Sequence, residues 1–345
     1  MLNAALASCQ ETKVPCGVEI DAVHEDGTPV PNAKVFARRT VGSTPNPNGG
    51  FPTDVNKMAR TETDSAGRAS LMYHASSGPE GQLWIRKDGY YPNYYPDLDW
   101  KAPAGGSPNA KWQASLKAVM KPIKNPIPMI FHRTCEVQLS EKSKSYGYDL
   151  EIGDAVAPLG KGKVADIEVV MDGTRTGSDL EKDQDIDFVA SIRFPNPLDG
   201  CFEFPSQLMD GTKGSALLSD CMAPESGYQA QLQRKAVWGR ARAGAAYWEY
   251  EHSLEKKGYY FRIRTKTDGS GNVNSCHYGK IYGPVTLLPG LKTRVNPPAV
   301  HEATLQLREV YFNPTSNDRN VECDTTVNLN KKLDEYGKPF QIDRP

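Results

Sequence analysis

The sequence predicts a mainly β protein made of two domains. Glycine (30 residues), proline (26) and tyrosine (16) are plentiful, and turn-forming residues recur at short intervals, a pattern that favours many short strands over long helices. A length of 345 residues corresponds to about two domains at roughly 150 residues each. Charges of both signs are mixed along the chain, with a net charge of −1, so no basic face indicates nucleic acid as a partner.

The clearest β pattern lies between Val18 and Tyr95. Apolar and polar residues alternate from Val18 to Val23, a turn follows at Asp26-Gly27, and a second run covers residues 29–37. Alternation on both sides of an Asp-Gly turn predicts a β-hairpin. Two more turn-and-strand signals follow, at residues 63–71 and 83–90.

The order of these signals resembles that of the carboxypeptidase regulatory-like domain, a small transthyretin-type β-sandwich. The matching stretches are Gly27-Thr28-Pro29-Val30, Asn32-Ala33-Lys34-Val35, Thr63-Asp64-x-x-Gly67 and Lys87-Asp88-Gly89-Tyr90. We therefore expect such a domain over residues 14–120. Members of this family are usually accessory modules without catalytic activity, so the resemblance implies scaffolding or binding.

Residues 1–13 are expected to be the remnant of a signal or lipid anchor, or a disordered tail. The stretch Leu6-Ala7-Ser8-Cys9 resembles the lipobox of bacterial lipoproteins, in which Cys9 would carry the acyl chains. Only eight residues precede Cys9, fewer than a signal segment needs, and an ordinary frayed terminus is the alternative. The lipoprotein interpretation predicts export to the outer membrane, cell surface or periplasm, with the lipid anchor as the membrane contact.

The cysteine count fits an exported protein. When Cys9 is set aside, six of the seven cysteines remain, an even number that disulfides can use. We predict a Cys201–Cys221 disulfide, because these residues flank one polar, Gly-rich loop whose closure would stabilise the fold by about 3 kcal/mol. The alternative is six buried thiols in a cytosolic protein.

The most aromatic segment covers residues 90–100. Two prolines there prevent a regular central strand, so several rings are expected on loops or edges, where they could stack on sugar rings. The alternative, which we favour, is packing in the domain core or against the next domain. The candidate ligand-binding residues are Tyr91, Tyr94, Tyr95, Asp97, Trp100 and Trp112.

A Pro-rich stretch at 121–130 predicts a stiff linker, and residues 131–345 then predict a larger β-sandwich or jelly-roll-like domain of unknown function. The clearest hairpin in this domain covers 259–282, with its turn at 268–272. One minor helix is expected over 241–257, an Ala-rich stretch with mixed Glu and Lys that ends before Gly258.

Motifs for catalysis or metal binding are missing from the sequence. The six histidines are scattered singly, no Gly-x-Ser-x-Gly occurs, and the acidic run 179–187 lacks the turn glycine of a calcium loop. We therefore expect no cofactor and no metal. The transthyretin-type sandwich is also similar to the core of intradiol dioxygenases, whose ferric iron takes two tyrosines and two closely spaced histidines. That alternative is disfavoured because the paired histidines are missing.

Together these observations predict a non-catalytic binding or structural module of the cell envelope, with polysaccharide or another envelope protein as partner. The alternative is a secreted, glycoside-directed hydrolase with a carboxylate pair in the C-terminal domain. The sequence leaves it open, because such pairs are usually far apart in the chain and 42 residues are acidic.

Overall fold

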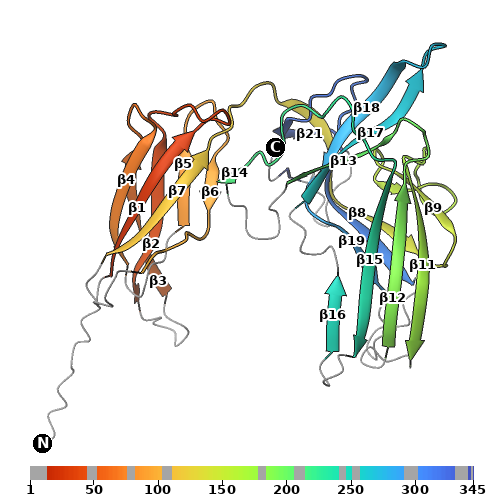
Figure 1. The fold of residues 1–345 in the computed structure, drawn as a ribbon, viewed down its shortest axis with the longest axis horizontal. Helices are drawn as coiled ribbons and strands as arrows, with labels where there is room; N and C mark the ends of the chain where they lie inside the picture. The colour runs from red at the N-terminus through yellow and green to blue at the C-terminus, as the bar shows by residue number, and fades with distance from the viewer. Residues whose placement is uncertain are drawn as a thin grey trace, which may run out of the picture. The chain divides into compact units, whose positions relative to one another are not determined.

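The computed structural model describes residues 14–44, 53–75, 82–102, 111–177, 184–205, 214–240, 246–250, 257–290, 302–330, 341–342 and 345. In these ranges the chain forms strands and turns, without a helix (Figure 1). The prediction of a mainly β fold is confirmed. None of the described segments is a helix of the length and apolarity that a membrane span requires.

The chain divides into two compact units. Unit 1 contains residues 1–123 and 210–216, and unit 2 contains residues 124–209 and 217–345. The chain thus leaves unit 1 after Ile123, returns to it for one short segment, and leaves it again.

Unit 1 has two sheets that enclose one apolar core. The three-stranded sheet has the order β4 (Arg68–Ala75), β1 (Val14–Val23), β7 (Trp112–Val119). The five-stranded sheet has the order β14 (Gly214–Ser215), β6 (Asn93–Tyr95), β5 (Gln82–Arg86), β2 (Lys34–Thr44), β3 (Thr53–Glu62). Alternate residues of β1, β2 and β5 point into the core, as the period-two pattern requires.

The predicted hairpin at Asp26-Gly27 is wrong beyond the turn itself. The turn forms, and Val23 pairs with Pro29, but β1 pairs with β4 and β7 whereas β2 lies in the other sheet. Pro29 and Pro31 lack the N–H that a continued ladder needs, so the chain crosses between the sheets at this point.

Unit 2 is a larger two-sheet structure. Its six-stranded sheet has the order β10 (Asp154–Ala155), β9 (Ser145–Asp149), β11 (Ile167–Gly177), β12 (Gln184–Arg193), β15 (Gln231–Arg240), β16 (Ala246–Tyr250). Its seven-stranded sheet has the order β13 (Gly200–Pro205), β17 (Lys257–Thr267), β18 (Val273–Ile281), β20 (Ala303–Phe312), β8 (Ile127–Leu139), β21 (Cys323–Asn328), with β19 (Val285–Pro289) paired to β20.

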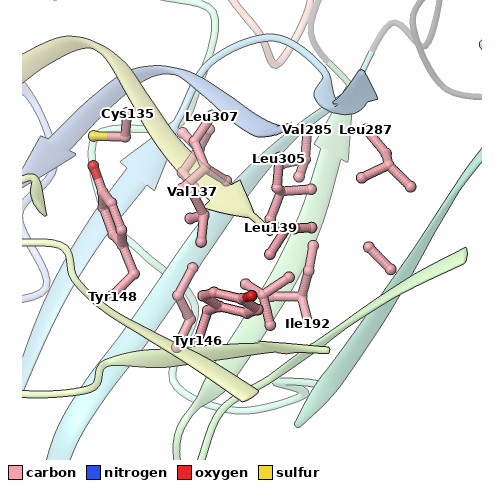
Figure 2. Packing of buried hydrophobic residues seen from close by; sticks show 14 of the residues in the cluster. Cys135, Val137, Leu139, Tyr146, Tyr148, Ile192, Val285, Leu287, Leu305 and Leu307 are labelled. Carbon is pink, nitrogen blue, oxygen red and sulfur yellow. The ribbon is translucent and has the colours of Figure 1, made fainter. Parts of the chain in front are cut away.

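The main core of unit 2 fills the space between these sheets (Figure 2). Val137 and Leu139 of β8 and Leu305 of β20 come from one sheet, and Tyr146 of β9 and Ile192 of β12 come from the other. A face-to-face arrangement of this kind buries one side of each sheet, which is the physical requirement for a sandwich.

Two expectations about unit 2 are corrected. The predicted helix over 241–257 is wrong, because β16 occupies Ala246–Tyr250 and β17 begins at Lys257; the rest of that stretch lies outside the described residues. Tyrosine and tryptophan favour strands, and β16 pairs with β15. The predicted linker at 121–130 is also shorter than expected, because β8 already begins at Ile127.

Candidate functional site

The structure places the candidate aromatic residues in different surroundings. Tyr91 and Tyr95 are each 7% exposed, so their rings face the interior. Trp100 and Trp112 are half-buried against the unit 1 core, and Trp100 lies edge-on to Tyr73, with ring centroids 6.2 Å apart. Asp97 is exposed in the loop after β6, and Tyr94 lies half-buried on the outer face of the five-stranded sheet. Of the six candidates, Tyr94 combines an aromatic ring with a place on that face.

Tyr94 belongs to a row of three aromatic rings that we call the aromatic stripe: Phe36 of β2, Trp84 of β5 and Tyr94 of β6. Phe36 pairs directly with Trp84, and Trp84 pairs directly with Tyr94. Because paired residues on neighbouring strands point to the same face, the three rings form a continuous line across three strands. All three are half-buried.

The alternation of the strands explains why these rings face outward. Val35 and Ala37 flank Phe36 and are buried, and Leu83 and Ile85 flank Trp84 and are buried. Phe36 and Trp84 therefore occupy the positions where a polar residue is usual. Phe36, Trp84 and Tyr94 thus form a contiguous apolar strip on the outer face, and contiguous exposed apolar patches, unlike single apolar residues, are a feature of interaction surfaces.

The rings are held in place by contacts within the face. Trp84 and Tyr94 stack with centroids 5.1 Å apart and planes 30° from parallel. At the other end, the guanidinium of Arg60 on β3 lies 5.8 Å from the centre of the Phe36 ring. Stacked aromatic pairs contribute about 0.5–1.5 kcal/mol beyond burial, so the stripe is preorganised before any ligand arrives.

Gly214 of β14 continues the row next to Tyr94. Its φ is +105°, and a Cβ built at this position would meet no atom within 4 Å. The edge of the Tyr94 ring is therefore not screened by a side chain of β14.

Basic residues lie on both sides of the stripe. Lys34 and Arg86 pair across β2 and β5 in the row before it, and Arg38 is paired with Gln82 in the row after it. Beside Lys34 and Arg86 the surface is hollowed into a cavity of about 560 Å³. Lys87, on its lining, donates to the carbonyl oxygen of Pro31 over 2.7 Å.

Unit 2 contains a cluster of three carboxylates around Arg264. The cluster bears on the hydrolase alternative, because that alternative requires a pair of carboxylates in the C-terminal domain. Arg264 donates from Nη2 to Asp149 over 2.9 Å and from Nε to Asp166 over 2.8 Å, and it also pairs with Glu151. Both aspartates are buried. The guanidinium occupies the space between the carboxylates, so the cluster serves as an ion network that ties β9 and β17 together.

The pKa values of the two buried aspartates shift in opposite directions. Burial alone would raise the pKa of Asp149, but N–H groups of Lys163, Ile152 and Val164 donate to its carboxylate and, with Arg264, lower it. For Asp166 burial dominates and raises the pKa, although Arg264 offsets part of the effect.

A second polar group in unit 2 is fully enclosed. The Nζ of Lys280 donates to Tyr282 over 2.8 Å and to Ser219 over 3.1 Å. Serine beside lysine is the composition of a nucleophile and its base. Lys280 and Tyr282 are 0% exposed and Ser219 is 1% exposed, so the group joins elements inside unit 2 and does not face a ligand.

The described residues do not form the predicted Cys201–Cys221 disulfide. Both are free thiols, and burial raises the pKa of Cys201 to about 11. Cys201 packs in the main core of unit 2, whereas the carbonyl of Cys221 accepts from Val321 in a separate apolar cluster. No group of three metal-ligating side chains occurs among the described residues, and Cys9 lies outside them.

Comparisons with known proteins do not assign the chain to a family. No protein family matches the sequence, and no curated protein matches it. A 3-chlorocatechol 1,2-dioxygenase from Rhodococcus opacus is 13% identical with a TM-score of 0.22, and the match covers 32% of this chain and 60% of the dioxygenase. The chain thus spans less than two thirds of that enzyme.

Two longer matches have similar scores. A Bacteroides uniformis protein provisionally named as carbohydrate binding is 9% identical with a TM-score of 0.20, covering 88% of this chain and 98% of that one. The major pilin SpaD of Corynebacterium diphtheriae is 8% identical with a TM-score of 0.19, covering 90% and 84%. Scores this low carry no argument about function, which has to be made from the residues.

Sequence reasoning found Tyr94 but missed Phe36 and Trp84. Each stands alone in its strand, about 50 residues from the other, and only the strand register unites them. The available signal was the phase of the alternation: both rings fall at outward positions between two buried aliphatic residues.

Proposed function

We propose that unit 1 is a carbohydrate-binding module and that the protein acts without catalysis as a binding or structural component of the cell envelope. The aromatic stripe carries the proposal. The apolar C–H face of a sugar ring packs on an aromatic ring, and three such rings in line suit a linear polysaccharide.

The dimensions and chemistry of the face support this ligand. Neighbouring strands are about 4.8 Å apart, so the stripe extends over about 10 Å, the length of roughly two sugar units. Arg38 and Gln82 on one side, and Lys34 and Arg86 on the other, supply donors for hydroxyl groups at the edges of the sugar rings.

The cell-envelope location in this proposal comes from the lipobox-like stretch that ends at Cys9. The mass of the N-terminal peptide from native membranes tests it, because an acylated Cys9 is expected. An unmodified Cys9 in that fraction would remove lipid anchoring from the proposal and leave the binding face untouched.

The main experiment is a screen of the purified full chain against neutral and anionic polysaccharides that records binding and released reducing ends together. We expect binding without release. Trp84→Ala should weaken the affinity at least about fivefold, the equivalent of about 1 kcal/mol, because it removes the central ring of the stripe.

Trp100→Ala is the matched control, since it also removes an indole from unit 1. It should lower the free energy of unfolding by about 2 kcal/mol through lost core packing and leave the affinity unchanged. Affinity that survives Trp84→Ala, or a panel without any bound polysaccharide, would contradict the proposal, and released sugars would favour the hydrolase.

A further inference from the structure

The stripe is bordered by four basic side chains that we call the basic rim: Lys34, Arg38, Arg60 and Arg86. All four are exposed, and all lie on strands of the five-stranded sheet next to the stripe. None of the ion pairs formed by the described residues includes any of them. Their charge is therefore available to a ligand.

Lys34 and Arg86 are direct partners across β2 and β5. Like charges in such a pair destabilise a sheet, which makes the arrangement costly for folding alone. An anion bound between them removes the repulsion. A guanidinium also holds a carboxylate or sulfate with two parallel hydrogen bonds.

The charged side chains that line the cavity beside Lys34 and Arg86 are also mainly basic. Its lining includes Lys34, Arg86 and Lys87 against one carboxylate, Asp88. Lys87 lies 5.3 Å from the centre of the Tyr90 ring, so it is held at the wall of the cavity. Glu62 pairs with Lys34 on its other side, and the four basic residues of the rim outweigh this one acid.

We infer that the ligand of the aromatic stripe is an anionic polysaccharide, whose sugar rings stack on Phe36, Trp84 and Tyr94 while its acidic substituents pair with Lys34 and Arg86. The inference rests on the proposed function, because the rings hold the sugar and the rim selects its charge. The charges of the basic rim chiefly set specificity: they discriminate between charged and neutral polysaccharides that the aromatic rings alone would bind equally well.

The test compares polygalacturonate with its carboxyl-reduced, neutral counterpart, using the full chain. The two polymers share a backbone, so any difference reports the carboxylates. We expect the charged polymer to bind at least about tenfold more tightly at about 0.1 M salt and to lose most of that advantage at about 1 M, where the Debye length falls to about 3 Å. A sulfated form of the carboxyl-reduced polymer, which keeps the same backbone, distinguishes sulfate from carboxylate recognition when it is measured alongside.

The double variant Lys34→Ala/Arg86→Ala should reduce the preference for the charged polymer at least about fivefold. Its matched control is Arg68→Ala/Lys117→Ala, which removes one arginine and one lysine from the exposed face of the other sheet and gives the same net charge. The control should keep the preference for the charged polymer, because Lys34 and Arg86 are intact in it. Both double variants lose two positive charges, so long-range attraction is equal and a difference between them reports local pairing with the rim.

The outcomes separate the two claims. Equal affinity for the two polymers, or an unchanged preference in Lys34→Ala/Arg86→Ala, overturns the anionic ligand while the stripe proposal stands. If Trp84→Ala keeps full affinity for the charged polymer, binding is charge attraction alone and both claims fail. The absence of binding to every polymer also overturns both.

Discussion

At the scale of single residues, the best-defined chemistry of unit 2 is the contact of Arg264 with Asp149, Glu151 and Asp166. Arg264 adopts φ = +57°, a conformation that non-glycine residues rarely take. Three carboxylates around one guanidinium offset the cost of burying these charges, and removing one of them leaves buried charge without its partner. The cluster therefore stabilises unit 2, and its contribution depends on pH.

The Asp149→Asn variant tests this contribution. The folded-state pKa of Asp149 is lowered, so its stabilisation is complete above the unfolded value of about 3.8 and is lost as pH falls through the folded value. We expect a loss of about 3 kcal/mol at neutral pH that shrinks below about pH 4. Urea unfolding over a pH series measures it.

Asp166→Asn is the comparison, because the folded-state pKa of Asp166 is raised. Stability from a raised carboxyl pKa is present at low pH and is lost as pH rises through the folded value. The stability that Asp166→Asn loses relative to the unaltered protein should therefore be larger at low pH than at neutral pH, which is the opposite of the trend for Asp149→Asn. Parallel pH profiles for the two variants would contradict the assigned shifts.

At the scale of elements, turns place the strands of unit 1. In the turn after β3, the Oγ1 of Thr63 accepts from the N–H of Ala33 over 2.8 Å and donates to the carbonyl of Val30 over 2.8 Å. The carbonyl of Gly67 accepts from the N–H of Ala22 over 2.8 Å. This turn thus joins the five-stranded sheet, which carries the stripe, to the three-stranded sheet.

Replacing the turn glycines by alanine tests whether this turn connects the two sheets. Gly27 and Gly67 have φ of +84° and +73°. A Cβ on Gly27 meets nothing within 4 Å, whereas one on Gly67 would lie 2.4 Å from the oxygen of Ala22. We expect Gly27→Ala to cost about 1 kcal/mol and Gly67→Ala about 3 kcal/mol in chemical unfolding. Equal costs would show that the backbone contact is not formed.

Elements also show what the sequence could and could not reveal. The alternation of β1, β2 and β5 predicted a β fold because half-buried strands require it. The prediction of a helix over 241–257 was wrong because it relied on the alanine content and neglected Tyr247, Trp248 and Tyr250, which favour strands. The disulfide failed because flanking a loop does not determine where a sulfur atom packs. The stripe required strand register, which one sequence does not contain.

At the scale of the whole molecule, the chain order differs from the spatial order. Unit 1 ends at Ile123 but takes its last strand, β14, from residues 214–215, with Ala216 donating to the carbonyl of Pro92 over 2.9 Å. Without this segment β6 is an edge strand with open hydrogen-bonding groups.

Two shortened chains test the role of β14. A chain of residues 14–123 should be about 2 kcal/mol less stable than one in which a flexible linker joins residues 14–123 to 210–216, since two or three backbone hydrogen bonds distinguish them. Thermal unfolding measures the difference. Identical melting temperatures would show that β14 contributes nothing to unit 1.

The same segment imposes an order on biosynthesis. A ribosome adds about 5–20 residues per second, so on the order of 10 s pass between the emergence of Ile123 and that of Ala216. During that interval the nascent unit 1 presents Tyr94 on an uncovered strand edge while residues 124–209 of unit 2 are still being made. Slower translation between these residues lengthens the exposure, and chaperones that shield strand edges have their longest opportunity to act there.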